Sequence, residues 1–341
     1  LCKVNEYKQD DACAKQKRKF EEKEMNLGLP YKGSKNTIAE DLVKCMPRGK
    51  KLLDACCGGG AVLMAAAMSG RWENVVGNDL NASTIALLDA VLMHKGQIEY
   101  EHPHVCKRQD FYNSLRRIEN GDFTIQDCVN KYCASFGNDG KSYLYGADIE
   151  EFKTTAEMML SSSKIEDRRY FYRKFIRFLL CDSSDEKLHS IDKLQQLEKL
   201  ERLKRLQRLQ QLERLQQLER LQRLQRIDIF DIDYSEFDVV YFDIPYKGTS
   251  KYDFEFNYDR FYDLFESLGK PAFLSEYNAP FNVIATFDKV QNMAVGSTGK
   301  IESLEKLYFN GTLDDYKRLM GPEYRPIGEK QLDIFSDLHE L

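Results

Sequence analysis

Four residues that could take part in a reaction directly follow the apolar run Val239–Phe242. They are Asp243-Ile244-Pro245-Tyr246. A carboxylate, a proline-restrained backbone and an aromatic ring at the end of a buried strand could grip a flat ring that carries an amine. An ordinary exit from a strand into a loop can have the same composition. The neighbouring motifs must therefore decide between these two interpretations.

A second candidate site is a strand, a glycine loop and a helix in succession. The segment Lys51–Cys56 predicts a short buried strand, Gly58–Gly60 a loop, and Ala61–Met68 a helix. Glycines at this position let a ligand approach backbone N–H groups at a helix N-terminus. Asp79 ends the next predicted strand, Trp72–Val76, where a carboxylate can accept both hydroxyls of a ribose. We therefore expect an adenosine-like cofactor, with a tight turn and a helix-capping Asp as the alternative.

The motif differs from those of dinucleotide-binding and ATP-binding proteins. It has no Gly-x-Gly-x-x-Gly pattern and no Gly-Lys-Ser/Thr of a phosphate loop. Dinucleotides and ATP are therefore poorer candidate ligands.

The elements around both motifs alternate between strands and helices. This order predicts an α/β protein with a doubly wound, mostly parallel sheet. We expect further helices over Thr37–Cys45 and Ser83–His94, and further strands over Ile227–Ile232, Val239–Phe242, Ala272–Ser275 and Val283–Phe287.

The composition narrows the class of protein. The chain has 341 residues, of which 42% are hydrophobic, enough for a core and a second unit. Its longest apolar run, Ala61–Met68, is too short to cross a bilayer. The nine cysteines show no Cys-x-x-Cys spacing, which favours reduced thiols over a disulfide frame or a zinc site. Glu101-His102-Pro103-His104 could bind a metal, but we interpret it as a surface cluster. We expect a cytoplasmic protein that needs no metal.

Residues 101–190 interrupt the alternation and predict an inserted, mainly helical unit. The net charge of the chain is −5, yet residues 164–226 contain 17 Lys and Arg against 10 Asp and Glu. A local basic surface of this kind can bind DNA. An amphipathic helix with solvated basic residues, and an exposed hairpin around Asn138, are the alternatives. The candidate DNA contacts are Asn138, Lys141, Arg168, Arg169, Arg173 and Lys174.

A triplet repeat separates the insert from the second half of the sheet. A leucine recurs at every third position from Leu194 to Leu224, separated by Gln, Glu, Lys and Arg. Three residues advance an α-helix by about 300°, so the leucines wind around it and form no fixed face. The spacing does not fit a heptad coiled coil, and long 3₁₀-helices are unfavourable. We predict a helical insert that could self-associate or bind a protein partner. An unusual three-residue packing or a β-layered oligomer stays open.

Several motifs in a fixed order resemble those of Dam-type DNA adenine-N6 methyltransferases, which use S-adenosylmethionine. The order is Pro30–Lys35, Asp54–Gly60, a long insert, and Asp243–Tyr246. The resemblance extends over about residues 27–310, without the repeat. It also includes Asn78-Asp79, Asp233-Tyr234 and Phe273–Tyr277. It implies a Rossmann-like methyltransferase fold whose inserted unit recognises the DNA target.

The resemblance also implies a role for each motif. One set of residues would bind the cofactor, from its methionine end to its adenine: Tyr31, Lys35, Asp54, Cys56, Gly58, Gly60, Asp79, Asp233 and Tyr234. The catalytic set Asp243, Ile244, Pro245 and Tyr246 would hold a target adenine that has been flipped out of the duplex. Ile244 stands where the commoner form of the motif has proline. Its contact is made by the main-chain carbonyl, so we expect isoleucine to be tolerated.

These observations predict a site-specific adenine methyltransferase, bacterial or phage-encoded and stand-alone or part of a restriction-modification system, with double-stranded DNA as its partner. Methylation of RNA or of a protein glutamine, and a catalytically weak DNA-binding or assembly protein, are the alternatives. The expected division is an N-terminal extension at 1–26, a catalytic domain at 27–100 and 227–320, a target-recognition domain at 101–190, the repeat at 191–226, and a C-terminal tail at 321–341.

Overall fold

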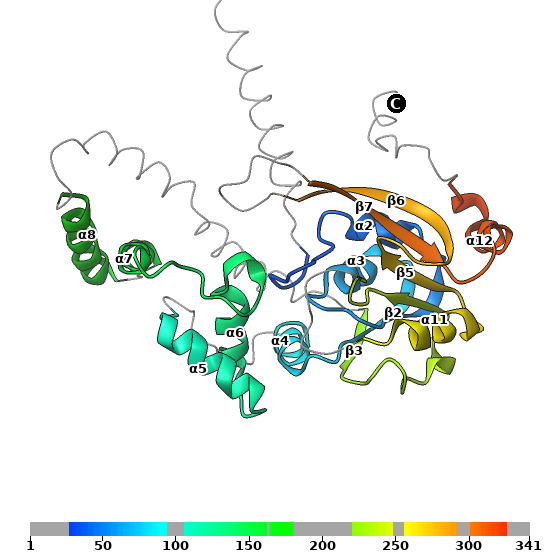
Figure 1. Ribbon diagram of the computed structural model, residues 1–341, viewed down its shortest axis with the longest axis horizontal. Coiled ribbons are helices and arrows are strands. Elements are labelled where there is room, and N and C mark those ends of the chain that lie inside the picture. Colours follow the sequence, from blue (N-terminus) through cyan, green and yellow to red (C-terminus); the bar gives the residue numbers. More distant parts are fainter. Residues whose placement is uncertain are drawn as a thin grey trace, which may run out of the picture.

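A seven-stranded sheet forms the framework of the part of the molecule on the right in Figure 1. The computed structural model describes residues 27–93, 106–161, 164–180, 220–247, 256–291 and 301–325. The strand order is β3-β2-β1-β4-β5-β7-β6. The first five strands run parallel and β7 is antiparallel to both β5 and β6. The strands are β1 (Gly49–Asp54), β2 (Trp72–Asn78), β3 (Leu221–Gln225), β4 (Val239–Phe242), β5 (Ala272–Glu276), β6 (Asn282–Gln291) and β7 (Ile301–Phe309).

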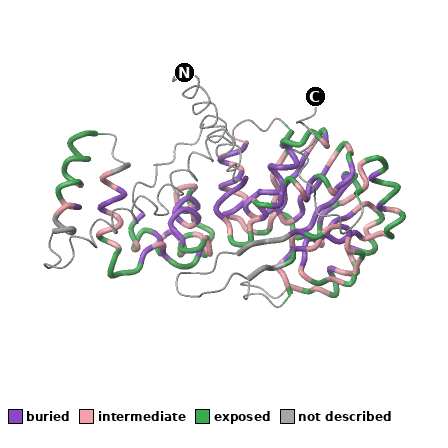
Figure 2. The backbone as a smooth tube through the Cα atoms, turned by 90° about the horizontal axis from the view of Figure 1, so that it is seen from above, coloured by how far each residue is buried: buried purple, intermediate pink, exposed green. Residues whose placement is uncertain are grey.

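Helices cover both faces of this sheet, as the doubly wound prediction requires. Neighbouring strand residues alternate between the faces: Leu52 belongs to one apolar cluster and Leu53 to the other. One cluster packs under α2 (Ala39–Lys44), α3 (Ala61–Ser69), α4 (Ala82–Leu92) and α12 (Leu313–Met320). The other packs under α11 (Tyr258–Ser267). Figure 2 shows that the buried residues concentrate in this part of the molecule.

Two strand predictions need correction. Ile227–Ile232 was expected to be a strand but forms a turn, and the strand lies just before it at Leu221–Gln225. The Asp228 side chain accepts a hydrogen bond from Phe230 N at 3.0 Å, and its carbonyl accepts one from Asp231 N at 2.9 Å. Local side-chain bonding of this kind favours a turn over a strand, even where buried isoleucines are present. The strand β7 was not predicted.

The inserted segment is mainly helical where the structure describes it. Its helices are α5 (Arg108–Glu119), α6 (Ile125–Cys133), α7 (Glu150–Ser161) and α8 (Ile165–Leu180), with the short 3₁₀-helix η1 (Phe136–Asn138) between α6 and α7. In Figure 1 these helices lie to one side of the sheet. Tyr132 of α6 joins them to the sheet domain, because its hydroxyl contacts Thr84 Oγ1 of α4 at 2.6 Å.

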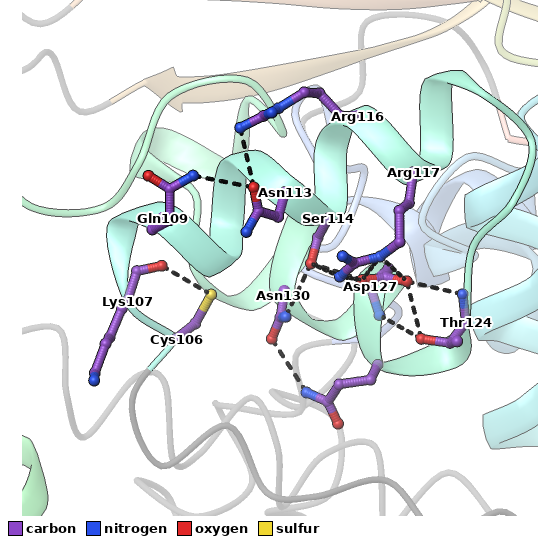
Figure 3. A network of polar contacts seen from close by, with 11 residues as sticks. Cys106, Lys107, Gln109, Asn113, Ser114, Arg116, Arg117, Thr124, Asp127 and Asn130 are labelled. Atoms are coloured by element: carbon purple, nitrogen blue, oxygen red, sulfur yellow. Dashed lines mark hydrogen bonds and ion pairs between the residues drawn. The ribbon is translucent and has the colours of Figure 1, made fainter.

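A buried carboxylate holds α5 and α6 together (Figure 3). Asp127 accepts hydrogen bonds from Arg117 Nε at 3.0 Å, from Ser114 Oγ at 2.8 Å and from Thr124 N at 2.9 Å. Burial opposes ionisation of Asp127, but these bonds outweigh it and hold its pKa well below the usual range. This network fixes the helical hairpin from which the rest of the insert extends.

Asn78 connects the ends of three parallel segments and is completely buried. Its Nδ2 donates to the carbonyls of Ala55, at 2.9 Å, and Ile227, at 3.0 Å. Its Oδ1 accepts from Ile227 N at 3.0 Å. The side chain therefore joins the end of β2 to the residues that follow β1 and β3.

Asn78→Ala should destabilise the protein by roughly 2–4 kcal/mol, because it leaves the carbonyl of buried Ala55 and the main-chain groups of Ile227 without these bonds. Urea unfolding followed by circular dichroism measures this change. Asn120→Ala, at an exposed helix end, is the control and should have little effect. An Asn78→Ala protein as stable as the control would contradict the role of Asn78.

Candidate active site

Parallel strands bring three carboxylates to one edge of the sheet. In the sheet register, Asp54 of β1 lies opposite Gly77 of β2 and Tyr241 of β4. Asp79 and Asp243 follow within two residues of those positions. Ligands of open α/β sheets bind at the carboxyl ends of the strands. The strand topology therefore gathers residues from three separate sequence motifs into one candidate site.

Lys35 forms an ion pair with Asp243 at the centre of this site. Its Nζ lies 2.7 Å from each carboxylate oxygen of Asp243 and 3.7 Å from Oε1 of Glu305. The Lys35 side chain is only 4% exposed, whereas that of Asp243 is 23% exposed. Burial would lower the pKa of Lys35, but the two carboxylates outweigh it and raise that pKa. Lys35 therefore stays charged, and part of the Asp243 carboxylate faces outward.

Tyr246 is held in position by contacts on several sides. Its hydroxyl donates to Glu305 Oε1, and Lys35 Nζ lies 4.8 Å from the centre of its ring. The edge of Tyr277 packs against it, with ring centres 4.7 Å apart. An aromatic ring fixed in this way can stack on a planar ligand without losing much conformational entropy.

Glu305 is a functional candidate that the sequence did not reveal. It lies on β7, is fully buried, and contacts both Lys35 and Tyr246. Burial raises its pKa to about 7, with Asp243 adding to the rise and Lys35 opposing it. A signal was present, since Glu305 is an acidic residue next to the apolar run Leu307–Phe309. It was missed because that strand was not predicted.

The glycine loop owes its composition to Tyr31. A Cβ at Gly58 would lie 3.1 Å from the Tyr31 ring, and one at Gly59 would lie 2.6 Å from Tyr31 Cβ. Gly60 has φ of +81°, a left-handed conformation that favours glycine. Leu29 N donates to the Gly59 carbonyl at 2.6 Å. The segment containing Tyr31 is thus packed directly on the loop.

Asp79 organises the opposite side of the loop. Its Oδ2 accepts from Gly58 N, and its Oδ1 accepts from Asn81 N, both at 2.8 Å. Burial raises the pKa of Asp79 despite these bonds. The carboxylate therefore stabilises the loop.

Asp54 has little compensation for its burial. It is 1% exposed, and within the described residues neither of its carboxylate oxygens has a hydrogen-bond partner. Burial, followed by the charges of Asp243 and Asp79, raises its pKa well above the usual range. A buried carboxylate without a donor is unfavourable. A cationic ligand beside Asp54 would relieve this electrostatic penalty, so the site fits a positively charged cofactor.

Two other predicted cofactor residues differ in their surroundings. The ring centres of Tyr234 and Phe242 lie 6.0 Å apart, and burial raises the pKa of Tyr234. Burial raises the pKa of the Cys56 and Cys57 thiols well above the usual range, which suits packing residues better than nucleophiles. Asp233 is exposed and caps the 3₁₀-helix η3 (Tyr234–Glu236) by accepting from Ser235 N at 2.9 Å.

The predicted DNA contacts fall into two groups. Asn138 and Lys141 lie in the turn after α6, where Asn138 has φ of +60°. Arg168, Arg169 and Arg173 are exposed on α8, and Lys174 pairs with Glu151 at 3.0 Å. Tyr170 and Tyr172 on the same helix are 63% and 55% exposed. The helix therefore does not bury all its aromatic residues, as a purely amphipathic helix would.

The described residues contain neither a metal-binding cluster nor a membrane-spanning helix. Across residues 27–93, 106–161 and the later described segments, no three His, Cys, Asp or Glu side chains gather as a metal site. The cluster Glu101-His102-Pro103-His104 lies outside the described residues. None of the described helices combines the length and apolar character needed to span a bilayer.

The doubly wound sheet, with the candidate residues at the carboxyl ends of its parallel strands, defines a Rossmann-like α/β protein. The family model for D12 class N6 adenine-specific DNA methyltransferases matches residues 31–308. The chain therefore belongs to that family of adenine-specific DNA methyltransferases, which confirms the resemblance, and the family implies a cofactor of the S-adenosylmethionine type. Among solved structures, the rRNA methyltransferase aviRa from Streptomyces viridochromogenes is 14% identical, with 80% of this chain and 82% of that chain covered and a TM-score of 0.30. No curated protein matches.

The raised pKa of Glu305 predicts a pH-dependent stability difference. Because its pKa in the folded protein, about 7, lies above its ordinary value of 4.5, stability falls as pH rises through this window. Glu305→Gln removes that loss. Its stability relative to wild type should rise by on the order of 1–3 kcal/mol between about pH 5 and pH 8. Urea unfolding at a series of pH values measures the difference.

Glu266→Gln is the matched control, since Glu266 is exposed on α11. Its stability relative to wild type should not change over the same pH range. A flat difference for Glu305→Gln would show that Glu305 is not held in a region that disfavours its charge.

Proposed function

We propose that Asp243, Ile244, Pro245 and Tyr246 hold the target adenine while its N6 accepts a methyl group. The observation that carries this assignment is the ion pair between Asp243 and the buried Lys35, beside the restrained ring of Tyr246. It fixes a carboxylate and an aromatic face next to each other at the ends of the central strands.

The residue types suit the reaction. The lone pair of an adenine amine is delocalised into the ring, which makes the amine a poor nucleophile. Hydrogen bonds from its two N–H groups to the Asp243 carboxylate and the Ile244 carbonyl would direct that lone pair toward the methyl donor. Tyr246 would stack on the base. The gain comes from orientation and preorganised electrostatics.

We call Asp243–Tyr246 the base clamp. Lys35 and Glu305 hold its side chains in place. Lys35 bonds to both oxygens of Asp243, so the carboxylate keeps one orientation. Glu305 accepts a hydrogen bond from the Tyr246 hydroxyl and thereby fixes the orientation of the Tyr246 ring. This differs from the initial assignment of Lys35 to the methionine end of the cofactor, because its nearest groups are those of the base clamp.

The cofactor side of the site is formed by the glycine loop and the carboxylates around it. We propose that Tyr31, Asp54, Cys56, Gly58, Gly60 and Asp79 hold S-adenosylmethionine, with Asp233 and Tyr234 near its adenine. The cofactor supplies an electrophilic methyl group. Its positive charge matches the unpaired carboxylate of Asp54, and Asp79 would accept the ribose hydroxyls.

The inserted helices are the proposed DNA-recognition unit. Exposed arginines on α8 can neutralise phosphates, and the exposed Tyr170 and Tyr172 offer faces for stacking. The amine lies inside a duplex, so the target base must be extruded before it reaches Asp243. Self-association through the triplet repeat stays a separate prediction, which the molar mass from light scattering would test.

Asp243→Ala should reduce the rate of methyl transfer to DNA by at least roughly 100-fold, because it removes the acceptor for the amine. Binding of S-adenosylmethionine, measured by calorimetry, should stay close to wild type. Asp231→Ala, an exposed residue in the preceding turn, serves as the control and should retain activity. Wild-type transfer of tritiated methyl groups by Asp243→Ala would overturn the assignment.

Replacing both Arg169 and Arg173 with Ala should weaken DNA binding and reduce its dependence on salt. The slope of log K against log salt should become shallower by roughly 1 for each lost phosphate contact. Fluorescence anisotropy with a labelled duplex measures both quantities. Arg325→Ala, exposed and far along the chain, is the control. An unchanged slope for the double variant would exclude α8 from the DNA interface.

A further inference from the structure

The last two leucine triplets form β3, the edge strand of the sheet. Leu221 and Leu224 lie in the same apolar cluster, on the face covered by α3 and α4. Leu224 Cδ2 and Leu63 Cδ2 occupy the space beside Gly77, 2.7 and 2.8 Å from where a Cβ would stand. Side chains alternate along a strand, so residues three apart normally point to opposite faces. The position of both leucines on one face needs a cause.

That cause is a break in the register between β2 and β3. Val75 pairs with Leu221, whereas Val76 pairs with Arg223 and Gly77 with Leu224. Gln222 is the extra residue, and its side chain is exposed. A bulge of this kind sets two residues of one strand against one of its neighbour. It converts the three-residue spacing of the repeat into the two-residue spacing of a sheet face.

The remaining contacts of β3 do not depend strongly on its sequence. Val75 N donates to the Arg220 carbonyl at 2.9 Å, and Asp79 N donates to the Gln225 carbonyl at 3.3 Å. The spacer side chains are exposed or half-buried. Arg223 reaches Glu236, at 3.3 Å, in an exposed ion pair of the kind that adds little stability. Within β3, the two leucines make the contacts that most require a particular residue type. Arg226, just after the strand, donates from Nε to the Leu80 carbonyl at 3.0 Å in an exposed position.

A contact just after the C-terminal end of β3 decides which residues form the strand. Ile227 bonds to the side chain of Asn78 through both its N–H and its carbonyl. Only Arg226 separates this anchor from the end of β3. Whichever residues stand a fixed distance before Ile227 therefore fall into the strand.

We propose that the edge of β2 is a binding site for any Leu-x-x-Leu-x segment, and that any two consecutive triplets of this chain can fill it as β3. The triplets that precede Leu221 repeat the same pattern of leucine and long polar spacers. Adding or removing whole triplets changes only the chain before the strand. Adding or removing one or two residues near Ile227 misplaces both leucines.

The test compares two deletions before Ile227. Deleting Leu218–Arg226 removes three whole triplets and brings Leu212 and Leu215 to the positions of Leu221 and Leu224, with Arg214 and Gln216 at those of Arg223 and Gln225. Deleting Glu219–Arg226 removes one residue fewer and puts Leu215 and Leu218 at the positions of Arg223 and Arg226. The longer deletion should keep Tm within about 2 °C of wild type and retain methyl transfer. The shorter one should lower Tm by roughly 10 °C or more.

The control places the same leucine substitutions in the full-length chain and in the deletion variant. Replacing Leu212 and Leu215 with Gln should leave the Tm of the full-length chain unchanged. The same pair of substitutions in the Leu218–Arg226 deletion should lower Tm as much as Leu221→Gln with Leu224→Gln does in the full-length chain. Two results would overturn the proposal: a destabilised Leu218–Arg226 deletion, or equal Tm values for the two deletions.

Discussion

The ion pair between Lys35 and Asp243 is the constraint on which the site depends. Its partners are 208 residues apart in sequence, and the lysine is almost completely buried. A buried charge must be paired closely and in the right geometry, since removing either partner leaves the other without compensation. The segment that carries Lys35 must therefore pack against the end of β4. The same segment places Tyr31 on the glycine loop through separate contacts with Gly58 and Gly59, so it connects the base clamp to the cofactor side.

The sheet brings several carboxyl groups to the edge where we propose that the cationic cofactor binds. Asp54, Asp79 and Asp243 come from different strands, and parallel register alone brings them to one edge. Among the described residues of the site, Lys35 supplies the positive charge that offsets these carboxyls. The carboxylate oxygens of Asp54 have no hydrogen-bond partner among the described residues. Glu305 adds a fourth carboxyl whose pKa is raised to about 7. Perturbed carboxyls are typical of functional sites, because binding and catalysis need groups that folding alone would not favour.

Sequence reasoning found the parts of the site that local chemistry marks. Glycines before a helix, a carboxylate after a strand, and the Asp243–Tyr246 motif each carry a signal within a few residues, and the structure brings these motifs together. The signal for Glu305, an acidic residue near an apolar run, is weak, because its role comes from β7, a strand paired antiparallel at the far side of β5. Asn78 was noticed only as a neighbour of Asp79, although it connects three segments. Its role depends on Ile227, which is 149 residues away.

The predicted helix is wrong for the last two triplets of the repeat, which form β3. Three-residue spacing fits neither an α-helix face nor a regular strand. A single bulge removes the conflict, and a bulge is specified by the neighbouring strand and by an anchor, not by the repeat itself. Here Gly77 leaves room for Leu224, and Asn78 fixes Ile227. The centre of the sheet thus requires particular residues at β1 and β4, whereas its edge requires only leucine in the correct phase. A repetitive segment can occupy such an edge because few contacts there distinguish one triplet from the next.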